Sequence, residues 1–251
     1  IQTLDVPEFA EGPWLHQRDG LYYLTYASHL GIHDSEMIAY ATATSMEGPW
    51  TYRGLLTGKA DRSFTIHPGI IEFKDQWYLF YHNASLTIDG KAGAIGRRAV
   101  CVDYLYYNPD GSMRYVEQTQ EGITLSPKSA EEQSKVHNPV VWADVPDISM
   151  IRVGDTYYMS STTMHMNPGV PVMKSKNLVD WEMASYAYNT LGDQDEFELK
   201  NGKNAYGGGT WASSLRYHNG QYYISTFCNN SDLNYIFTTD DPDKTPWTMK
   251  A

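Results

Sequence analysis

Four segments of the chain share one pattern, in which a short polar turn leads into a strand of alternating apolar and aromatic residues. The four segments are RDGLYYLTYAS (18–28), FKDQWYLFYHNA (73–84), VGDTYYMSSTT (153–163) and HNGQYYISTFC (218–228). Tight turns such as Asp-Gly and Asn-Gly between alternating runs are strong local signals for a β-hairpin. The pattern therefore predicts four hairpins.

A second segment follows each hairpin after a few residues, and these partner segments cover 36–54, 97–116, 170–184 and 234–249. In three of them a strand ending in Thr, Ser or Lys is followed by a short polar stretch and then a tryptophan, which we expect to open an outer strand. One such unit cannot bury both faces of its sheet, so the copies must pack against one another. The repeats predict an all-β fold, a β-propeller with four recognisable blade units.

One segment differs from the rest of the chain. SPKSAEEQSKVHN (126–138) is polar and has no aromatic residue, as is typical of a linker or a long crossing loop. We therefore expect two halves, 1–125 and 138–251, joined by a linker at 126–137.

Composition narrows the classes of partner. The net charge is −11 and lysines and arginines do not cluster, which argues against a nucleic-acid partner. No apolar run approaches the roughly 20 residues that a membrane helix needs. Cys101 and Cys228 lie in apolar strand contexts without the spacing of a zinc or redox motif. We expect buried free thiols, with a single disulfide as the alternative.

Two carboxylates lie in an unusual sequence context, beside proline, glycine and tryptophan. Glu11 lies in PEFAEGPWLH and Asp147 in NPVVWADVPDIS, each just before a predicted hairpin turn. A buried carboxyl with a raised pKa can act as a general acid, and a better solvated one can activate water. Glycosidic hydrolysis needs two carboxyls in those roles. The alternative is that each carboxylate only accepts hydrogen bonds from backbone N–H groups in a turn. Asp144 lies so near Asp147 in sequence that it is a rival for the role of the base.

These segments resemble glycoside hydrolase family 43, whose members are inverting, five-bladed propeller enzymes that act on xylan and arabinan side chains. Residues 138–181 resemble its first blade and 208–225 its second. Residues 8–28 resemble its fourth blade, and 67–83 with 96–112 resemble its fifth. The resemblance implies a β-xylosidase or α-L-arabinofuranosidase that takes xylo- or arabino-oligosaccharides and requires no cofactor.

The resemblance also implies roles for individual residues. Asp147 in VPDIS matches the general base that activates water, and Glu11 in FAEGP matches the general acid. His67 in TIHPG matches a histidine near the propeller axis, beside a central calcium ion or water. The alternative for His67 is a buried histidine that only bonds to backbone.

Further matches concern the sugar site. Arg98 in GRRAV matches a fifth-blade arginine that points into the pocket, although it could instead pair with Asp103. Trp211 in GTWAS and the pair Met164 and His165 match positions that line the sugar subsite. Trp211 could also be a core residue.

The chain departs from the family in order and in content. Its fourth- and fifth-like blades come first, and no segment resembles the third blade, which supplies the aspartate that orients the acid and tunes its pKa. The chain is therefore either a single permuted propeller or the joined fragments of two tandem domains. Unclosed blade edges favour a homodimer.

Two further expectations accompany this interpretation. The enzyme is expected to be exported, secreted or periplasmic in a bacterium, although residues 1–9 lack the layout of a signal peptide. Loss of the third blade would impair catalysis. The alternative function is therefore a non-catalytic carbohydrate-binding propeller, or an inactive fragment of a tandem enzyme.

Overall fold

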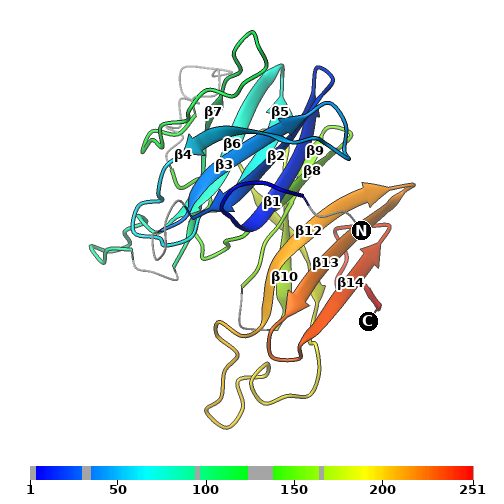
Figure 1. Cartoon of the computed structure of the whole chain (residues 1–251). Coiled ribbons are helices and arrows are strands. Elements are labelled where there is room, and N and C mark those ends of the chain that lie inside the picture. The colour runs from blue at the N-terminus through cyan, green and yellow to red at the C-terminus, as the bar shows by residue number, and fades with distance from the viewer. Residues whose placement is uncertain (1–3, 30–34, 94–96, 124–137, 164–166, 251) are drawn as a thin grey trace, which may run out of the picture. The chain divides into compact units, whose positions relative to one another are not determined.

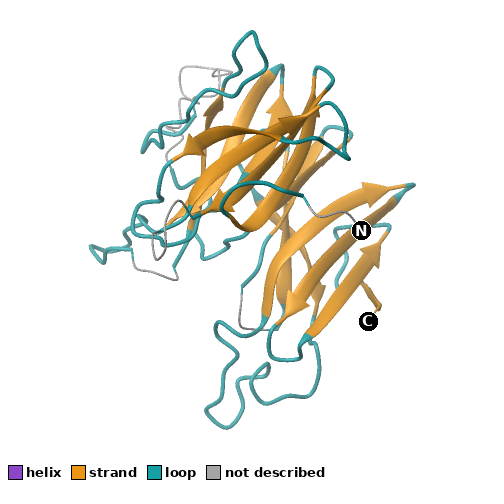
Figure 2. Cartoon of the chain, in the orientation of Figure 1, coloured by secondary structure: helices purple, strands orange, loops and turns teal. Residues whose placement is uncertain are grey.

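The computed structural model describes residues 4–29, 35–93, 97–123, 138–163 and 167–250. Every regular element in these ranges is a β-strand, as Figure 2 shows. None of the described residues forms a helix of the length and apolar character that would span a bilayer. The chain divides into two compact units, Ile1–Asp144 and Val145–Ala251. The predicted linker at 126–137 lies outside the described residues.

The first sheet of unit 1 is an antiparallel meander in the order β1-β2-β3-β4 (Figure 1). Its strands are β1 (Phe9–Arg18), β2 (Leu21–Ser28), β3 (Met37–Ala43) and β4 (Thr51–Thr57). Asp19 and Gly20 join β1 to β2 with φ values of 49° and 81°, the left-handed backbone that a two-residue hairpin turn requires. Most of β2 and β3 is buried.

The second sheet of unit 1 has three strands, β5 (Gly69–Phe73), β6 (Gln76–Asn83) and β7 (Ala99–Leu105). The segment that begins at Asn138 lies along the free edge of β7. The Val140 amide donates to the Val100 carbonyl at 2.8 Å, and Asn138 Oδ1 accepts the Val102 amide at 2.9 Å. These bonds satisfy part of an edge that would otherwise expose its backbone groups.

Unit 2 contains two four-stranded antiparallel sheets, each again a meander in chain order. One comprises β8 (Ser149–Val153), β9 (Thr156–Ser160), β10 (Gly169–Ser175) and β11 (Glu182–Tyr188). The other comprises β12 (Thr210–His218), β13 (Gln221–Cys228), β14 (Leu233–Thr239) and β15 (Thr248–Lys250). The core between them includes Val172, Ile224, Phe237 and Trp247.

The meander in chain order is the topology of a propeller blade. In each unit the first strands of the two sheets contact one another, β1 with β5 and β8 with β12, as the innermost strands of neighbouring blades do. The predicted all-β fold, its four hairpins and its four blade units are confirmed. So is the position of the blade tryptophans, because Trp50, Trp181 and Trp247 each stand directly before an outer strand.

The two cysteines are as expected from their apolar surroundings. Cys101 on β7 and Cys228 on β13 are buried and free. Burial raises the pKa of the Cys101 thiol, with the nearby Asp103 adding to the shift. Such thiols are poor nucleophiles and pack as small apolar side chains.

Candidate active site

Glu11 lies where β1 departs from regular pairing with β2. Register shifts flank it, between Phe9 and Glu11 and between Glu11 and Trp14. Such bulges bend a strand and redirect its side chains, often beside an active site. Gly12 has φ +59°, and a Cβ atom there would lie 2.9 Å from His67 Cγ. Glycine at this position therefore lets the imidazole pack against β1.

The carboxylate of Glu11 meets the imidazole of His67. Glu11 Oε1 lies 3.1 Å from His67 Nε2, and the Glu11 side chain is 45% exposed whereas His67 is buried. The hydrogen bond to His67 lowers the pKa of Glu11, and this effect outweighs the opposite effect of burial. A raised pKa, as expected for a general acid, is therefore wrong for Glu11 in the free protein.

Glu36 lies in the same cluster, although its sequence context did not predict a site residue. Its side chain is buried, and Oε2 accepts the Ile66 amide at 3.0 Å. One ligand atom each from Glu11, Glu36 and His67 lie within 4.8 Å of one another. Burial raises the pKa of Glu36 to about 7. The only sequence signal was an acidic residue directly before the apolar run of β3.

A short chain of contacts connects Arg98 to the same site. Its guanidinium Nη1 donates to Thr65 Oγ1 at 2.9 Å, and Thr65 Oγ1 lies 3.1 Å from His82 Nε2. The rings of His82 and His67 are 5.4 Å apart, and the charge of Arg98 contributes to the lowered pKa of Glu11. Unit 1 thus brings together three predicted site residues: Glu11, His67 and Arg98.

Asp103, the alternative partner expected for Arg98, and Asp144, the alternative base, both have structural partners. Asp103 accepts hydrogen bonds from the Tyr81 hydroxyl at 2.6 Å and the Thr119 hydroxyl at 2.5 Å. Asp144 Oδ1 accepts the Arg98 amide at 3.2 Å. Both carboxylates therefore fix loops around the strands of unit 1.

In unit 2, Asp147 occupies a buried turn two residues before β8. It has φ +58°, a left-handed conformation that aspartate tolerates better than most residues, and only 6% of it is exposed. The Pro146 carbonyl before it accepts the Ser161 hydroxyl at 2.5 Å and the Thr162 amide at 3.3 Å. These bonds fix the backbone that carries the carboxylate.

Trp211 lies at the same end of unit 2 as Asp147. The Thr162 amide bonds to Pro146, next to Asp147, and the Thr162 hydroxyl donates to the carbonyl of Thr210, next to Trp211. The indole is 39% exposed and its Nε1 donates to the Gly207 carbonyl at 3.3 Å. Trp211 is therefore placed as a partly open aromatic face, and it is not a core residue. Met164 and His165 lie outside the described residues.

Comparison with known proteins identifies the family. The sequence model described as "Glycosyl hydrolases family 43" matches residues 3–113 and 136–251. The chain belongs to glycosyl hydrolase family 43. A "Beta-xylosidase" of Formosa agariphila is 37% identical over 113 residues, which are 44% of this chain and 18% of that protein. A "Xylosidase/arabinosidase" of Bacteroides ovatus is 34% identical over 45% of this chain and 32% of that protein.

A solved structure shares the fold over most of the chain. An exo-β-1,3-galactanase of Phanerochaete chrysosporium covers 96% of this chain and 50% of its own, with a TM-score of 0.59 and 12% identity. This likeness concerns the fold alone. A "Bifunctional GH43-CE" protein of Bacteroides eggerthii is 57% identical over 45% of this chain and 16% of its own, with a TM-score of 0.42. The alignments cover less than a third of the two curated relatives named above.

Proposed function

We propose that this family 43 chain contributes to a glycoside hydrolase that cleaves xylo- or arabino-configured substrates with inversion. Glu11 is the general acid and Asp147 the general base. The observation that carries the proposal is the half-exposed Glu11 carboxylate on a bulged strand, held by the buried His67 beside Glu36. Relatives named β-xylosidase and arabinofuranosidase support the substrate class.

In an inverting hydrolysis the two carboxyls act in one step. Asp147 takes a proton from water as its oxygen attacks the anomeric carbon. Glu11 gives a proton to the glycosidic oxygen as the bond to the leaving sugar breaks. Trp211 would offer a ring face to a sugar, and Arg98, Met164 and His165 are the other residues proposed for the sugar subsite.

Glu11 must carry a proton when the sugar is bound, although His67 favours its ionised form in the free protein. Desolvation of the Glu11 carboxyl by a bound sugar would raise its pKa and favour the protonated acid.

A structural calcium ion is a second part of the proposal. Glu11, Glu36 and His67 offer two carboxylates and one imidazole, whereas Ca²⁺ takes six to eight mainly oxygen ligands. Glu36 and His67 would hold the ion with water completing its shell, and its charge would keep Glu36 ionised. Calcium would then raise the melting temperature of the wild type but not of Glu36→Gln.

Hydrolysis of aryl glycosides tests the proposed roles. Aryl β-D-xyloside and aryl α-L-arabinofuranoside are supplied to the wild type, Glu11→Gln and Asp147→Asn. Each variant should lose at least about 100-fold in rate, because general acid and base catalysis contribute about 10²–10⁴-fold. Asp155→Asn, an exposed change in the β8–β9 turn, is the control and should retain the rate. Equal rates in all four proteins would refute the assignment.

A non-catalytic carbohydrate-binding propeller is the second candidate. The lowered pKa of Glu11 in the free protein favours it, because an ionised carboxylate cannot protonate a leaving group. A folded wild type that binds xylo-oligosaccharides without releasing aryl products would support this candidate over the enzyme.

Export to the periplasm or medium is a further proposal. A homodimer formed through blade edges is another, and light scattering tests it.

A further inference from the structure

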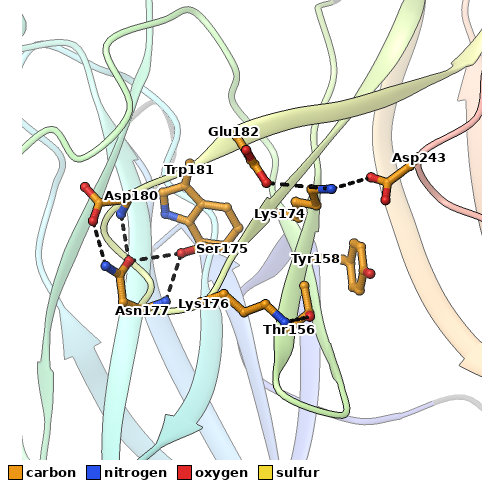
Figure 3. A pocket seen from close by; sticks show the side chains of 10 residues that line it. All are labelled: Thr156, Tyr158, Lys174, Ser175, Lys176, Asn177, Asp180, Trp181, Glu182 and Asp243. Carbon is orange, nitrogen blue, oxygen red and sulfur yellow. Dashed lines mark hydrogen bonds and ion pairs between the residues drawn. The ribbon is translucent and has the colours of Figure 1, made fainter.

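A groove lies at the end of β8–β11 that is remote from Asp147. Its volume is about 580 Å³, within the roughly 300–1,000 Å³ of small-molecule sites, and β9, β10, β11 and the β14–β15 loop form its lining (Figure 3). Asp147 precedes the first residue of β8, whereas the groove begins at Thr156, beyond its last. The five residues of β8 alone span about 17 Å. The groove is therefore separate from the site that contains Asp147.

One face of the sheet supplies the floor of the groove. Lys174 of β10 lies directly opposite Tyr158 of β9 and Glu182 of β11, so the three side chains form a row across the strands. Lys174 Nζ lies 2.8 Å from Asp243 Oδ1 and 3.6 Å from Glu182 Oε1. The floor thus presents the phenol ring of Tyr158 beside an ammonium group that is already paired with two carboxylates.

The balance of charge restricts the ligand. The lining contains two ammonium groups, Lys174 and Lys176, and three carboxylates, Asp180, Glu182 and Asp243. Each ammonium group already meets a carboxylate, since Lys176 Nζ lies 2.6 Å from Asp155 Oδ1. A phosphate, sulfate or uronate would therefore meet net negative charge. A neutral ligand rich in hydroxyls would find both donors and acceptors.

A rigid turn holds an indole at the wall of the groove. Ser175 Oγ accepts the Leu178 amide at 2.9 Å, and Asn177 Oδ1 accepts the Asp180 amide at 2.8 Å. Trp181 Nε1 donates to the Leu178 carbonyl at 3.0 Å. The ring is thus fixed before a ligand arrives, which lowers the entropic cost of binding.

The equivalent tryptophan of the next blade behaves differently. Trp247 is only 4% exposed and belongs to the core of unit 2. Trp181 is half-buried and lines the groove (Figure 3). Packing in the core of unit 2 therefore accounts for Trp247 more fully than for Trp181.

We propose that this groove is a second carbohydrate site, which binds a neutral oligosaccharide segment through Trp181 and Tyr158. This second site rests on the proposed function, because its ligand is taken to be the polymer whose bonds the active site cleaves. The apolar faces of the two aromatic rings contact the C–H faces of the sugars. The carboxylates of Glu182 and Asp243 accept hydrogen bonds from the sugar hydroxyls. A chain held here keeps the enzyme on its polymer.

Calorimetric titration with xylohexaose tests the groove. The full chain carries Asp147→Asn so that the sugar is not cleaved, and Trp181→Ala and Glu182→Ala are added separately. We expect Trp181→Ala to weaken binding at one class of site by about three- to tenfold, as expected for loss of an aromatic contact. Glu182→Ala removes an exposed side chain while Lys174 keeps Asp243 as its partner at 2.8 Å, and it should weaken binding at the same class of site.

Met183→Ala is the matched control. Met183 is exposed and adjacent to Glu182, but its side chain points to the other face of β11. Unchanged affinity in Trp181→Ala and Glu182→Ala, with loss in Trp211→Ala, would overturn the groove and leave the proposed function intact. Absence of any xylohexaose binding would also overturn it. The aryl glycosides are too short to need the groove, so their hydrolysis decides the proposed function separately.

Discussion

At the scale of single residues, Gly12 determines how closely His67 approaches Glu11. We predict that Gly12→Ala destabilises the fold by about 1–3 kcal/mol, because it combines left-handed backbone with a Cβ atom 2.9 Å from the imidazole. Gly20→Ala is the control, since Gly20 has φ +81° and no heavy atom within 4 Å of the added Cβ. Urea unfolding measures both. Equal losses would show that His67 does not constrain position 12.

His16 provides a pH-dependent contribution at the same scale. Its ring stacks on Tyr23 with 4.7 Å between centroids, its Nε2 lies 2.7 Å from the Tyr107 hydroxyl, and burial lowers its pKa to about 3. The unfolded chain, with an ordinary histidine pKa near 6.5, binds a proton that the folded chain does not. Stability is therefore lost as the pH falls from about 6.5 towards 3.

His16→Gln tests this contribution, because glutamine can keep a hydrogen bond to Tyr107 but does not titrate. The slope due to His16 is at most about 1.4 kcal/mol per pH unit. Between pH 7 and pH 5 the wild type should lose about 2 kcal/mol more than the variant. Denaturant unfolding at both values measures this difference. Parallel losses would mean that His16 is protonated in the folded protein.

At the scale of elements, Trp247 anchors β15 to the neighbouring sheet of unit 2. Its Nε1 donates to Ser185 Oγ at 3.1 Å, and its amide donates to the Ala187 carbonyl at 3.0 Å. Trp247→Ala should lower the free energy of unfolding by about 3–5 kcal/mol, as expected for a large buried side chain. Met249 is exposed on β15, and Met249→Ala should change the free energy of unfolding by less than about 0.5 kcal/mol. A loss below 1 kcal/mol for Trp247→Ala would mean that the two sheets do not share this core.

The elements were also the part of the structure most readily predicted from sequence. A hairpin depends on a two-residue turn and on alternation, both local, and the turn at Asp19 and Gly20 shows the backbone that those residues favour. The role of Glu36 could not be predicted in this way. Its burial and its contact with Ile66 depend on a loop thirty residues further along the chain. The lowered pKa of Glu11 likewise required the position of His67.

At the scale of the whole molecule, the proposed function requires two groups of residues to act on one sugar. Unit 1 carries Glu11, His67 and Arg98, and unit 2 carries Asp147 and Trp211. A permuted propeller would bring both groups to one pocket within a chain. Joined fragments of tandem domains would require a second copy or further sequence to complete it. In either arrangement, the proposed inverting mechanism requires the two carboxyls to face one sugar.

The distance between the carboxyl oxygens of Glu11 and Asp147 tests this claim most directly. A crystal structure of the full chain with bound xylotriose would measure it, both within one copy and between copies. An inverting mechanism predicts a separation of about 6.5–9.5 Å across the sugar, with room for one water molecule. A separation several times larger, within every chain and across every contact between copies, would contradict the account.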